Sequence, residues 1–426
     1  MIVAPVAVQR LTDLRQLLAS MNHAPGIVDL ENALVSFKSL DRLHFARILI
    51  LNDETRDDIE VYGLEQRTYP LYLAFMGDFD GSYDTFLADL VRVSGSGLMQ
   101  IFSCCEDFHT DADLFHWMKS RNRAAAAIYV NWIGRTARQI REESFLYDSL
   151  QTYLQNNRSA LAAMQSGQIR DVLKQYVATE LQDGHITLTP PEPTPLRWQI
   201  RNLLHLSCVP LVLLLLTPFL LLYAPLFIFQ LRRRERSDTE IAPRVNTRHV
   251  NRLATLEDHD VTNQFSAFGT IKPGIFRRGT LIFFLGAIDY TTRHIYKQGR
   301  LARVNTIHFA RWVFLDNKQR LFFASNYDGS LDSYMDDFIN KVAFGLNLVF
   351  SNGIGYPTTN WLILDGAKDE QKFKDYIRRH ELPTEVWYNA HPGLTALDLQ
   401  RNALIRQGIQ KATMTPAEVQ QWLRLF

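Results

Sequence analysis

The sequence predicts an α+β protein in which two similar units flank an apolar segment. The first observation is a pattern that occurs twice: residues 43–47 read LHFAR and residues 307–311 read IHFAR. The second is that GDFDGSYD at 77–84 is followed, late in the chain, by SNYDGSLD at 325–332. The third is the uncharged, almost wholly apolar run at 206–231. A pattern repeated within one chain indicates repeated structure, and a long apolar run indicates contact with a membrane.

The composition narrows the class of protein. A chain of 426 residues, of which 46% are hydrophobic, can form two or three ordinary domains. Its net charge is only +1, so it lacks the basic footprint of a nucleic-acid-binding protein. The three cysteines match neither a disulfide framework nor a zinc-ligand spacing, which favours a reducing compartment. The first ten residues lack a basic segment followed by an apolar one, so no signal peptide is expected.

Each unit is expected to contain strands and helices in one shared order. Apolar, β-branched runs predict strands, and apolar residues spaced three and four apart predict helices. The first unit is assigned strands at 44–51 and 70–76, a helix from Ser82, a strand at 98–104, a helix at 111–121 and a strand at 125–132. The second is assigned strands at 308–315 and 320–325, a helix from Ser330, a strand at 346–350, a helix at 369–380 and a strand at 385–388.

The rest of the chain is expected to be helical or irregular. Short helices are predicted within 9–38, amphipathic helices at 137–183, a stiff proline-rich linker at 189–195 and irregular surface structure at 237–274. The predicted domains are an N-terminal helical arm (1–38), α+β repeat 1 (39–136), a helical segment with the linker (137–195), a membrane segment (196–236), a connecting region with a second apolar patch (237–302), α+β repeat 2 (303–395) and a C-terminal helical tail (396–426).

Three prolines interrupt the apolar run. Pro210, Pro218 and Pro225 each remove a backbone donor and tend to kink or break a helix. Arginines flank the run on both sides, and positive charge favours the cytoplasmic side of a membrane. A membrane-inserted, proline-broken helical hairpin is therefore expected, with both repeats on the cytoplasmic side, and a single span is the main alternative. The second apolar patch, at 280–288, is interpreted either as an interfacial helix or as a core helix.

The histidine and arginine of the repeated pattern are candidate site residues. Side chains alternate along a strand, so His44 and Arg47 lie on opposite faces, as do His308 and Arg311. One interpretation is that the imidazoles bind a cofactor and the guanidinium groups line a cavity. The other is that both are buried structural residues satisfied by their neighbours.

The Asp-Gly-Ser element lies between a strand and a helix in both copies. The glycine permits a tight turn, and Ser82 or Ser330 can cap the helix that follows. This structural interpretation explains the repeat without giving it a catalytic role. The functional interpretation makes Asp80 or Asp328 a catalytic proton-transfer group at a cavity mouth.

The two predicted sheet-and-helix units, at about 40–135 and 303–395, resemble the dimeric α+β barrel superfamily, in which two ferredoxin-like units pack sheet to sheet. The resemblance implies two such repeats forming a pseudo-dimeric barrel, although a hairpin ahead of the first helix departs from the simple ferredoxin-like order. Within this superfamily, dye-decolourising peroxidases carry a Gly-x-x-Asp-Gly motif, and 77–81 matches it as a string. In copy two, Ser325 replaces the first glycine. The resemblance implies haem as a cofactor, with His109, His116, His294 or His308 as its ligand.

The sequence therefore predicts a membrane-associated protein that binds an apolar or lipid-like small molecule between two repeats. Its sharper version is an oxidative enzyme of peroxidase or monooxygenase type, with Asp80 as proton shuttle and Arg47 or Arg311 stabilising a negative oxygen species. The alternative is a non-catalytic, membrane-tethered binding or scaffold protein. Membrane lipid and an apolar small molecule are the expected partners, nucleic acid is not, and no protein partner or metal site is indicated.

Overall fold

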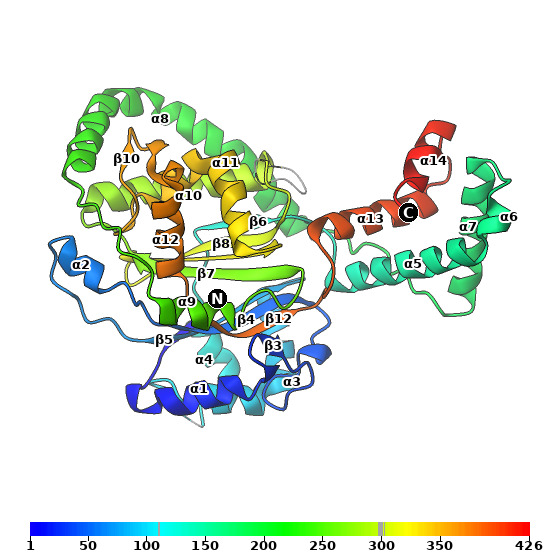
Figure 1. Cartoon of the computed structure of the whole chain (residues 1–426), viewed down its shortest axis with the longest axis horizontal. Coiled ribbons are helices and arrows are strands. Elements are labelled where there is room, and N and C mark those ends of the chain that lie inside the picture. Colours follow the sequence, from blue (N-terminus) through cyan, green and yellow to red (C-terminus); the bar gives the residue numbers. More distant parts are fainter. Residues whose placement is uncertain (110, 297–300, 302) are drawn as a thin grey trace.

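The computed structural model describes residues 1–109, 111–296, 301 and 303–426. It is a mixed α+β protein with two four-stranded antiparallel sheets, a projecting helical arm and one long apolar helix (Figure 1). The first sheet has the order β1 (Ile2–Pro5), β5 (Tyr72–Phe79), β4 (Leu43–Leu51), β12 (Thr384–Asn389). The second has the order β6 (Ala127–Val130), β8 (Ile307–Leu315), β9 (Arg320–Asp328), β7 (Thr262–Thr270).

Each sheet takes one edge strand from the other half of the chain. In the first sheet β12 pairs with β4, and Trp387 stands opposite Arg47. In the second sheet β6 pairs with β8, and Ile128 stands opposite Arg311. The two halves of the chain therefore interlock, because neither sheet is complete without a strand from the other half.

Helices cover the outer face of each sheet, and an apolar layer fills the space between the sheets. The first sheet is covered by α1 (Leu11–Ala19), α3 (Tyr83–Phe102) and α4 (Leu114–Ser120), and the second by α10 (Ile275–His294), α11 (Leu331–Phe350) and α12 (Glu370–His380) (Figure 1). Along β4, Ala46, Ile48 and Ile50 contact the helices, whereas Leu49 and Leu51 face the other sheet. This alternation buries both faces of the strand, as its continuous apolar pattern predicts.

The helical arm projects to one side of the sheets (Figure 1). It comprises α5 (Ala137–Asn156), α6 (Arg158–Leu161), α7 (Ser166–Gln182), α13 (Ala396–Gln410) and α14 (Pro416–Leu423). α5 and α13 closely follow β6 and β12, and each begins at a threonine, Thr136 or Thr395, that forms a capping box. Buried side chains such as Leu150 and Leu173 give the arm its own small core. The helices predicted at 137–183 are confirmed.

The apolar run forms one continuous helix, α8 (Leu196–Ser237), so the predicted hairpin geometry is wrong. Its three prolines, Pro210, Pro218 and Pro225, lie inside the helix without reversing the chain. They are spaced by 218 − 210 = 8 and 225 − 218 = 7 residues, which separates them by only about 80° and 20° around a helix. Kinks on the same side of a helix bend it in the same direction. Accordingly, α8 curves as an arch over the helices of the second sheet (Figure 1).

Other predicted segments also differ from the structure. The strands predicted at 98–104 and 346–350 are wrong, since these residues mainly form the last turns of α3 and α11. The last turns of both helices are buried on several sides, so their apolar residues do not follow the three-and-four spacing of an amphipathic helix. Each unit therefore has the order β-β-α-α-β. The segment predicted to be irregular, 237–274, contains β7, and the predicted helical arm at 1–38 supplies β1 to the first sheet.

The remaining elements are short. They are η1 (Val8–Arg10), β2 (Asn22–Ala24), β3 (Ile27–Val28), η2 (Phe37–Ser39), α2 (Asp57–Val61), α9 (Thr247–Ala254), β10 (Thr359–Asn360), β11 (Leu364–Asp365) and η3 (Gly366–Lys368). The end of the predicted connecting region, at 297–300 and 302, lies outside the described residues.

Candidate functional site

His44 and His308, the predicted cofactor-binding residues, each occupy a β-bulge. The register of β4 against β5 shifts between the two neighbours of His44, and that of β8 against β9 shifts in the same way around His308. A bulge takes one side chain out of the strand alternation and re-aims it. Each imidazole consequently hydrogen-bonds the aspartate, Asp80 or Asp328, that lies at the end of the neighbouring strand.

Asp80 joins a strand, a histidine and a helix. Nε2 of His44 donates to its Oδ1 at 3.0 Å, and the backbone N–H of Ala137 donates to its Oδ2 at 2.7 Å. Ala137 is the first residue of α5, so the carboxylate stabilises the start of that helix. The predicted cap of α3 is confirmed, because the Ser82 hydroxyl accepts from the N–H of Thr85. Asp80 thus holds the arm to the first sheet.

Asp328 makes the same contacts in the second sheet. Nε2 of His308 donates to its Oδ1 at 2.6 Å, and the N–H of Ala396, the first residue of α13, donates to its Oδ2 at 2.8 Å. The hydroxyl of Thr262 is a third donor, at 3.1 Å. The predicted cap of α11 is also confirmed, since the Ser330 hydroxyl accepts a backbone N–H. Both aspartates therefore connect an arm helix to a sheet.

His391 extends the first cluster into a buried chain of hydrogen bonds. Its Nε2 lies 3.1 Å from Nδ1 of His44. Because Nε2 of His44 donates to Asp80, Nδ1 is the acceptor and His391 the donor. Burial, together with the nearby His44 and His308, holds the pKa of His391 well below its ordinary value, so its ring is neutral near pH 7. The corresponding place beside His308 is taken by Trp132, at 4.9 Å between ring centroids.

Arg47 and Arg311 are both engaged with groups on the opposite sheet. Arg311 pairs with Asp78. Arg47 donates to Asn326, to the hydroxyl of Ser266 and to two main-chain carbonyls. Burial lowers the pKa of Arg47 to about 9, and Asp78 opposes that shift. In this arrangement neither guanidinium is free to stabilise a bound oxygen species.

The surroundings of the two histidines do not fit a haem. Nε2 of His44 and of His308 is bonded to a carboxylate, and aromatic rings pack against both imidazoles. The cavity lined by Asp80 has a volume of about 220 Å³. Pockets that bury a small molecule typically measure ~300–1,000 Å³. Neither histidine therefore presents a free Nε2 to a cavity that would hold a haem.

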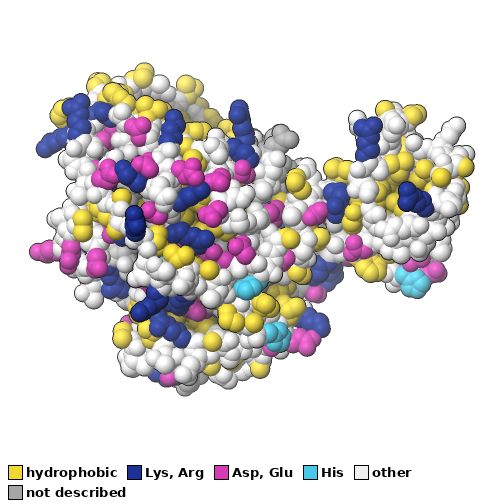
Figure 2. Space-filling model, viewed as in Figure 1, with side chains coloured by type: hydrophobic (Ala, Val, Ile, Leu, Met, Phe, Trp, Pro, Cys, Tyr) yellow, Lys and Arg dark blue, Asp and Glu magenta, His cyan; other side chains and the backbone are white. Residues whose placement is uncertain are grey.

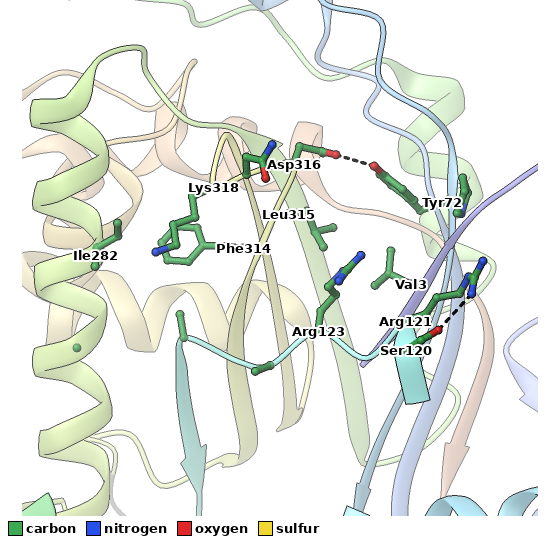
Figure 3. A pocket seen from close by; sticks show the side chains of 15 residues that line it. Val3, Tyr72, Ser120, Arg121, Arg123, Ile282, Phe314, Leu315, Asp316 and Lys318 are labelled. Atoms are coloured by element: carbon green, nitrogen blue, oxygen red, sulfur yellow. Dashed lines mark hydrogen bonds between the residues drawn. The ribbon is translucent and has the colours of Figure 1, made fainter. Parts of the chain in front are cut away.

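A larger cavity, of about 950 Å³, opens between the sheets at the end opposite His44. Its apolar walls come from β1, β8 and α10, as shown by Val3, Phe314, Leu315 and Ile282 in Figure 3. Its cationic side chains are Arg121, Arg123 and Lys318, and its one carboxylate, Asp316, accepts from the hydroxyl of Tyr72 at 2.5 Å. The cavity thus combines apolar and polar walls with net positive charge among its described lining residues, and none of the residues predicted as a site lines it.

α8 carries an apolar surface that the rest of the described chain leaves uncovered. Every side chain from Pro210 to Tyr223 is exposed, and Leu222 is 82% exposed. Figure 2 shows hydrophobic side chains along the edge where α8 lies. Exposed apolar residues continue onto α10 and the β10–β11 turn, as Ile275, Phe283, Trp361, Ile363 and Leu364. Soluble monomers rarely expose so large a continuous apolar patch. Of the described helices, α8 is long and apolar enough to cross a bilayer.

Comparison of the chain with protein-family models, with curated proteins and with solved structures gives no match. The structure brings together His44 with Asp80 and His308 with Asp328, whereas each arginine lies in a separate network. Sequence reasoning missed His391, because a His-Pro-Gly turn carries no signal of its pairing with a distant strand. It also missed the cationic cavity, whose described lining residues come from five separate segments.

Proposed function

We propose that the protein is a monotopic membrane protein that binds an amphiphilic small molecule, with an apolar body and an anionic end, in the cavity between its two sheets. One observation carries the membrane part: both ends of α8 are attached to α10, and the middle is exposed. A helix held in this way enters one leaflet and returns without crossing the bilayer. This proposal keeps both repeats on the cytoplasmic side.

The dimensions of the arch support partial insertion. The hydroxyl of Tyr290 donates to the carbonyl of Leu206, and the ring of Phe276 packs on that of Phe227. The path along α10 is 290 − 276 = 14 residues, or ~21 Å, and the path along α8 is 227 − 206 = 21 residues, or ~31 Å. Because the path along α8 is longer than the path along α10, α8 bows away from α10 between the two contacts, which favours an interfacial helix over one that crosses a bilayer core of ~30 Å.

Charges and aromatic rings at the ends of α8 support the same orientation. Arg197 and Arg201 precede the exposed stretch, and Arg232 to Arg236 follow it with one glutamate among them. Basic residues at both ends favour one, cytoplasmic, side. The guanidinium of Arg232 lies 4.6 Å from the ring centroid of the half-exposed Trp361, and tryptophan prefers the membrane interface.

The cavity between the sheets supports binding of an amphiphile. Its volume suits a molecule with a lipid-like apolar body, and its cations outnumber its carboxylate. Ile282 and Gly286 of α10 form part of its wall, and the neighbouring Phe283 is exposed beside the arch. A ligand could therefore enter from the membrane surface along α10.

We also propose that the two halves are copies of one unit, packed sheet to sheet as in the dimeric α+β barrel superfamily. The bulged histidines, the aspartates that bind arm helices and the exchanged edge strands support this proposal. The same difference in residue number, 248, separates two pairs of matching residues. It separates the aspartates, since 80 + 248 = 328, and the non-helical residues Ser94 and Val342 inside α3 and α11, since 94 + 248 = 342. A shared kink is explained by a common origin.

A vesicle flotation assay tests the membrane part. Leu222→Glu in the middle of α8 should sharply reduce flotation with phosphatidylcholine vesicles, since it introduces a charge where the proposal places lipid. Leu397→Glu on the arm is the matched control, because Leu397 is also exposed but lies far from α8. Equal flotation of the two variants contradicts the proposal. Tags at the two termini should share one protease-accessible side of sealed vesicles, and tags on opposite sides would also contradict it.

A cavity-filling variant tests the ligand part. A side chain added at Gly286 meets no atom within 4 Å and enters the space beside the cavity. Gly286→Leu should therefore reduce the amount of amphiphile that co-purifies, as measured by native mass spectrometry. Gly279→Leu is the control, since Gly279 lies on the same helix, is equally unobstructed and does not line the cavity. An unchanged ligand content in Gly286→Leu, or an empty wild type, contradicts this part.

The non-catalytic version of the function has more structural support than the oxidative one. The six residues predicted as a catalytic or cofactor site, Arg47, Asp80, Arg311, Asp328, His44 and His308, all make hydrogen bonds that stabilise the fold. An absorption spectrum of the protein produced with ample haem tests the remaining alternative. We expect no Soret band, and a stoichiometric one would restore the peroxidase interpretation.

A further inference from the structure

A second cavity, of about 390 Å³, lies at the start of α10 and adjoins the cavity between the sheets at Lys318. Its walls come from the loop after α2, the segment that joins β7 to α10, and the β8–β9 turn. Four cationic side chains and one carboxylate line it: Arg67, Lys272, Arg278, Lys318 and Glu65. This excess of positive charge favours an anionic ligand.

The buried charges next to this cavity are unbalanced. Lys272 is 4% exposed and Arg277 is 1% exposed, and both donate to the same oxygen of Asp238. The other oxygen of Asp238 accepts from the hydroxyl of Tyr62 at 2.7 Å. Nε and Nη1 of Arg277 are buried without an acceptor among the described residues. One carboxylate therefore serves two buried cations, and burial with the nearby Arg277 lowers the pKa of Lys272 to about 8.

The start of α10 lies beside this cationic cavity, because Gly274 and Arg278 line it. Gly274 precedes the helix with φ of 99° and provides no side-chain cap. The N–H groups of Ile275 and Phe276 have no acceptor among the described residues. The first turn has no acidic residue and instead carries Arg277 and Arg278, the unfavourable sign for a helix N-terminus. An anion bound in the cavity would offset the charge of Arg278 and lie near the positive end of the helix dipole.

We propose that this cavity binds a phosphate group. Phosphate accepts hydrogen bonds on several oxygens at once, so it suits a cavity lined by both guanidinium and ammonium groups. The group could belong to a lipid headgroup or to a soluble phosphate compound. The cavity lies at an end of the arch, where Phe227 contacts Phe276 and Arg234 lies 5.4 Å from the ring of Phe276. The lipid source rests on the proposed membrane attachment, whereas the phosphate site itself does not.

Titration calorimetry of the full-length protein with inorganic phosphate tests the site. Arg278→Gln removes a cavity cation that has no ion-pair partner among the described residues. It should weaken phosphate binding by about tenfold, which corresponds to the loss of ~1.4 kcal/mol. Arg293→Gln makes the same charge change at the far end of α10, where Arg293 pairs with Asp289, and should leave binding unchanged. An equal loss of phosphate binding in both variants overturns the proposal.

Vesicle binding distinguishes the two sources. Phosphatidic acid carries a terminal phosphate, and phosphatidylserine at matched surface charge controls for general electrostatics. A preference for phosphatidic acid that Arg278→Gln abolishes and Arg293→Gln retains supports a lipid headgroup. Phosphate binding in solution without this preference supports a soluble ligand. If the protein neither binds inorganic phosphate nor prefers phosphatidic acid, the proposal is overturned. If phosphate binds but Leu222→Glu floats normally, the membrane proposal fails and the phosphate site stands.

Discussion

Glu235 joins the end of α8 to the β10–β11 turn, and its removal should release that turn. Its carboxylate accepts from the N–H of Leu362 at 2.6 Å and the N–H of Trp361 at 3.1 Å. It also accepts from the hydroxyl of Thr359 at 3.2 Å and from the guanidinium of Arg232. Glu235→Ala leaves these donors without their acceptor. Breaking a buried charged pair by removing one partner typically costs about 3–5 kcal/mol.

The expected result follows from this magnitude. Because ~1.4 kcal/mol corresponds to a factor of ten, protection of the Leu362 amide against hydrogen exchange should fall by about a hundredfold to a few thousandfold, or to the unprotected rate. Glu240→Ala is the control, since Glu240 pairs with Lys372 at the surface. Such a pair contributes about 0–1 kcal/mol, so its loss should change the same amide less than about fivefold. Equal protection in the two variants refutes the assigned role of Glu235.

Three further predictions concern stability. Asp328→Asn should lower the free energy of unfolding by about 2–4 kcal/mol, because it weakens the charged hydrogen bonds and the start of α13. The change Asp332→Asn, at an exposed position in the first turn of α11, should alter it by less than about 1 kcal/mol; denaturant unfolding measures both. The pKa of His391 lies below its ordinary value of 6.5 in the fold, so unfolding takes up a proton below that pH. The contribution of His391 to stability is therefore constant above pH 6.5 and falls by up to ~1.4 kcal/mol per pH unit below it. His391→Gln should flatten that slope, and an unchanged slope contradicts the assignment. Gly97→Ala should prevent stable packing, since its Cβ would lie 2.0 Å from the carbonyl oxygen of Leu34, whereas Gly95→Ala meets only a side chain at 3.9 Å; equal melting temperatures contradict this.

The sequence correctly predicted the features that depend only on residues close together in the chain. The capping serines Ser82 and Ser330 were identifiable because a cap requires only a hydroxyl beside the first helical turn. The two faces of β4 follow from alternation, as Ile48 and Leu49 demonstrate. The interpretation of His44 and His308 as buried residues with partners also agrees with their hydrogen bonds.

The features that the sequence did not predict depend on contacts between residues far apart in the chain. No local signal indicates that β12 completes the first sheet, so the place of His391 beside His44 could not be derived. Asp78 lies in an apolar strand and is explained only by Arg311 on the other sheet. The prolines of α8 were expected to reverse the chain, but three kinks on one side of a helix bend it without breaking it.

The exchange of β6 and β12 constrains how the chain folds during synthesis. The edge of β4 that β12 covers stays unpaired until the ribosome has made 384 − 51 = 333 further residues. At about 5–20 residues per second, this delay lasts roughly 17–67 s. An open strand edge exposed for that time can pair with another chain. α8 is completed during this interval, before most of the second sheet exists, so its apolar surface is made while the first sheet still lacks β12.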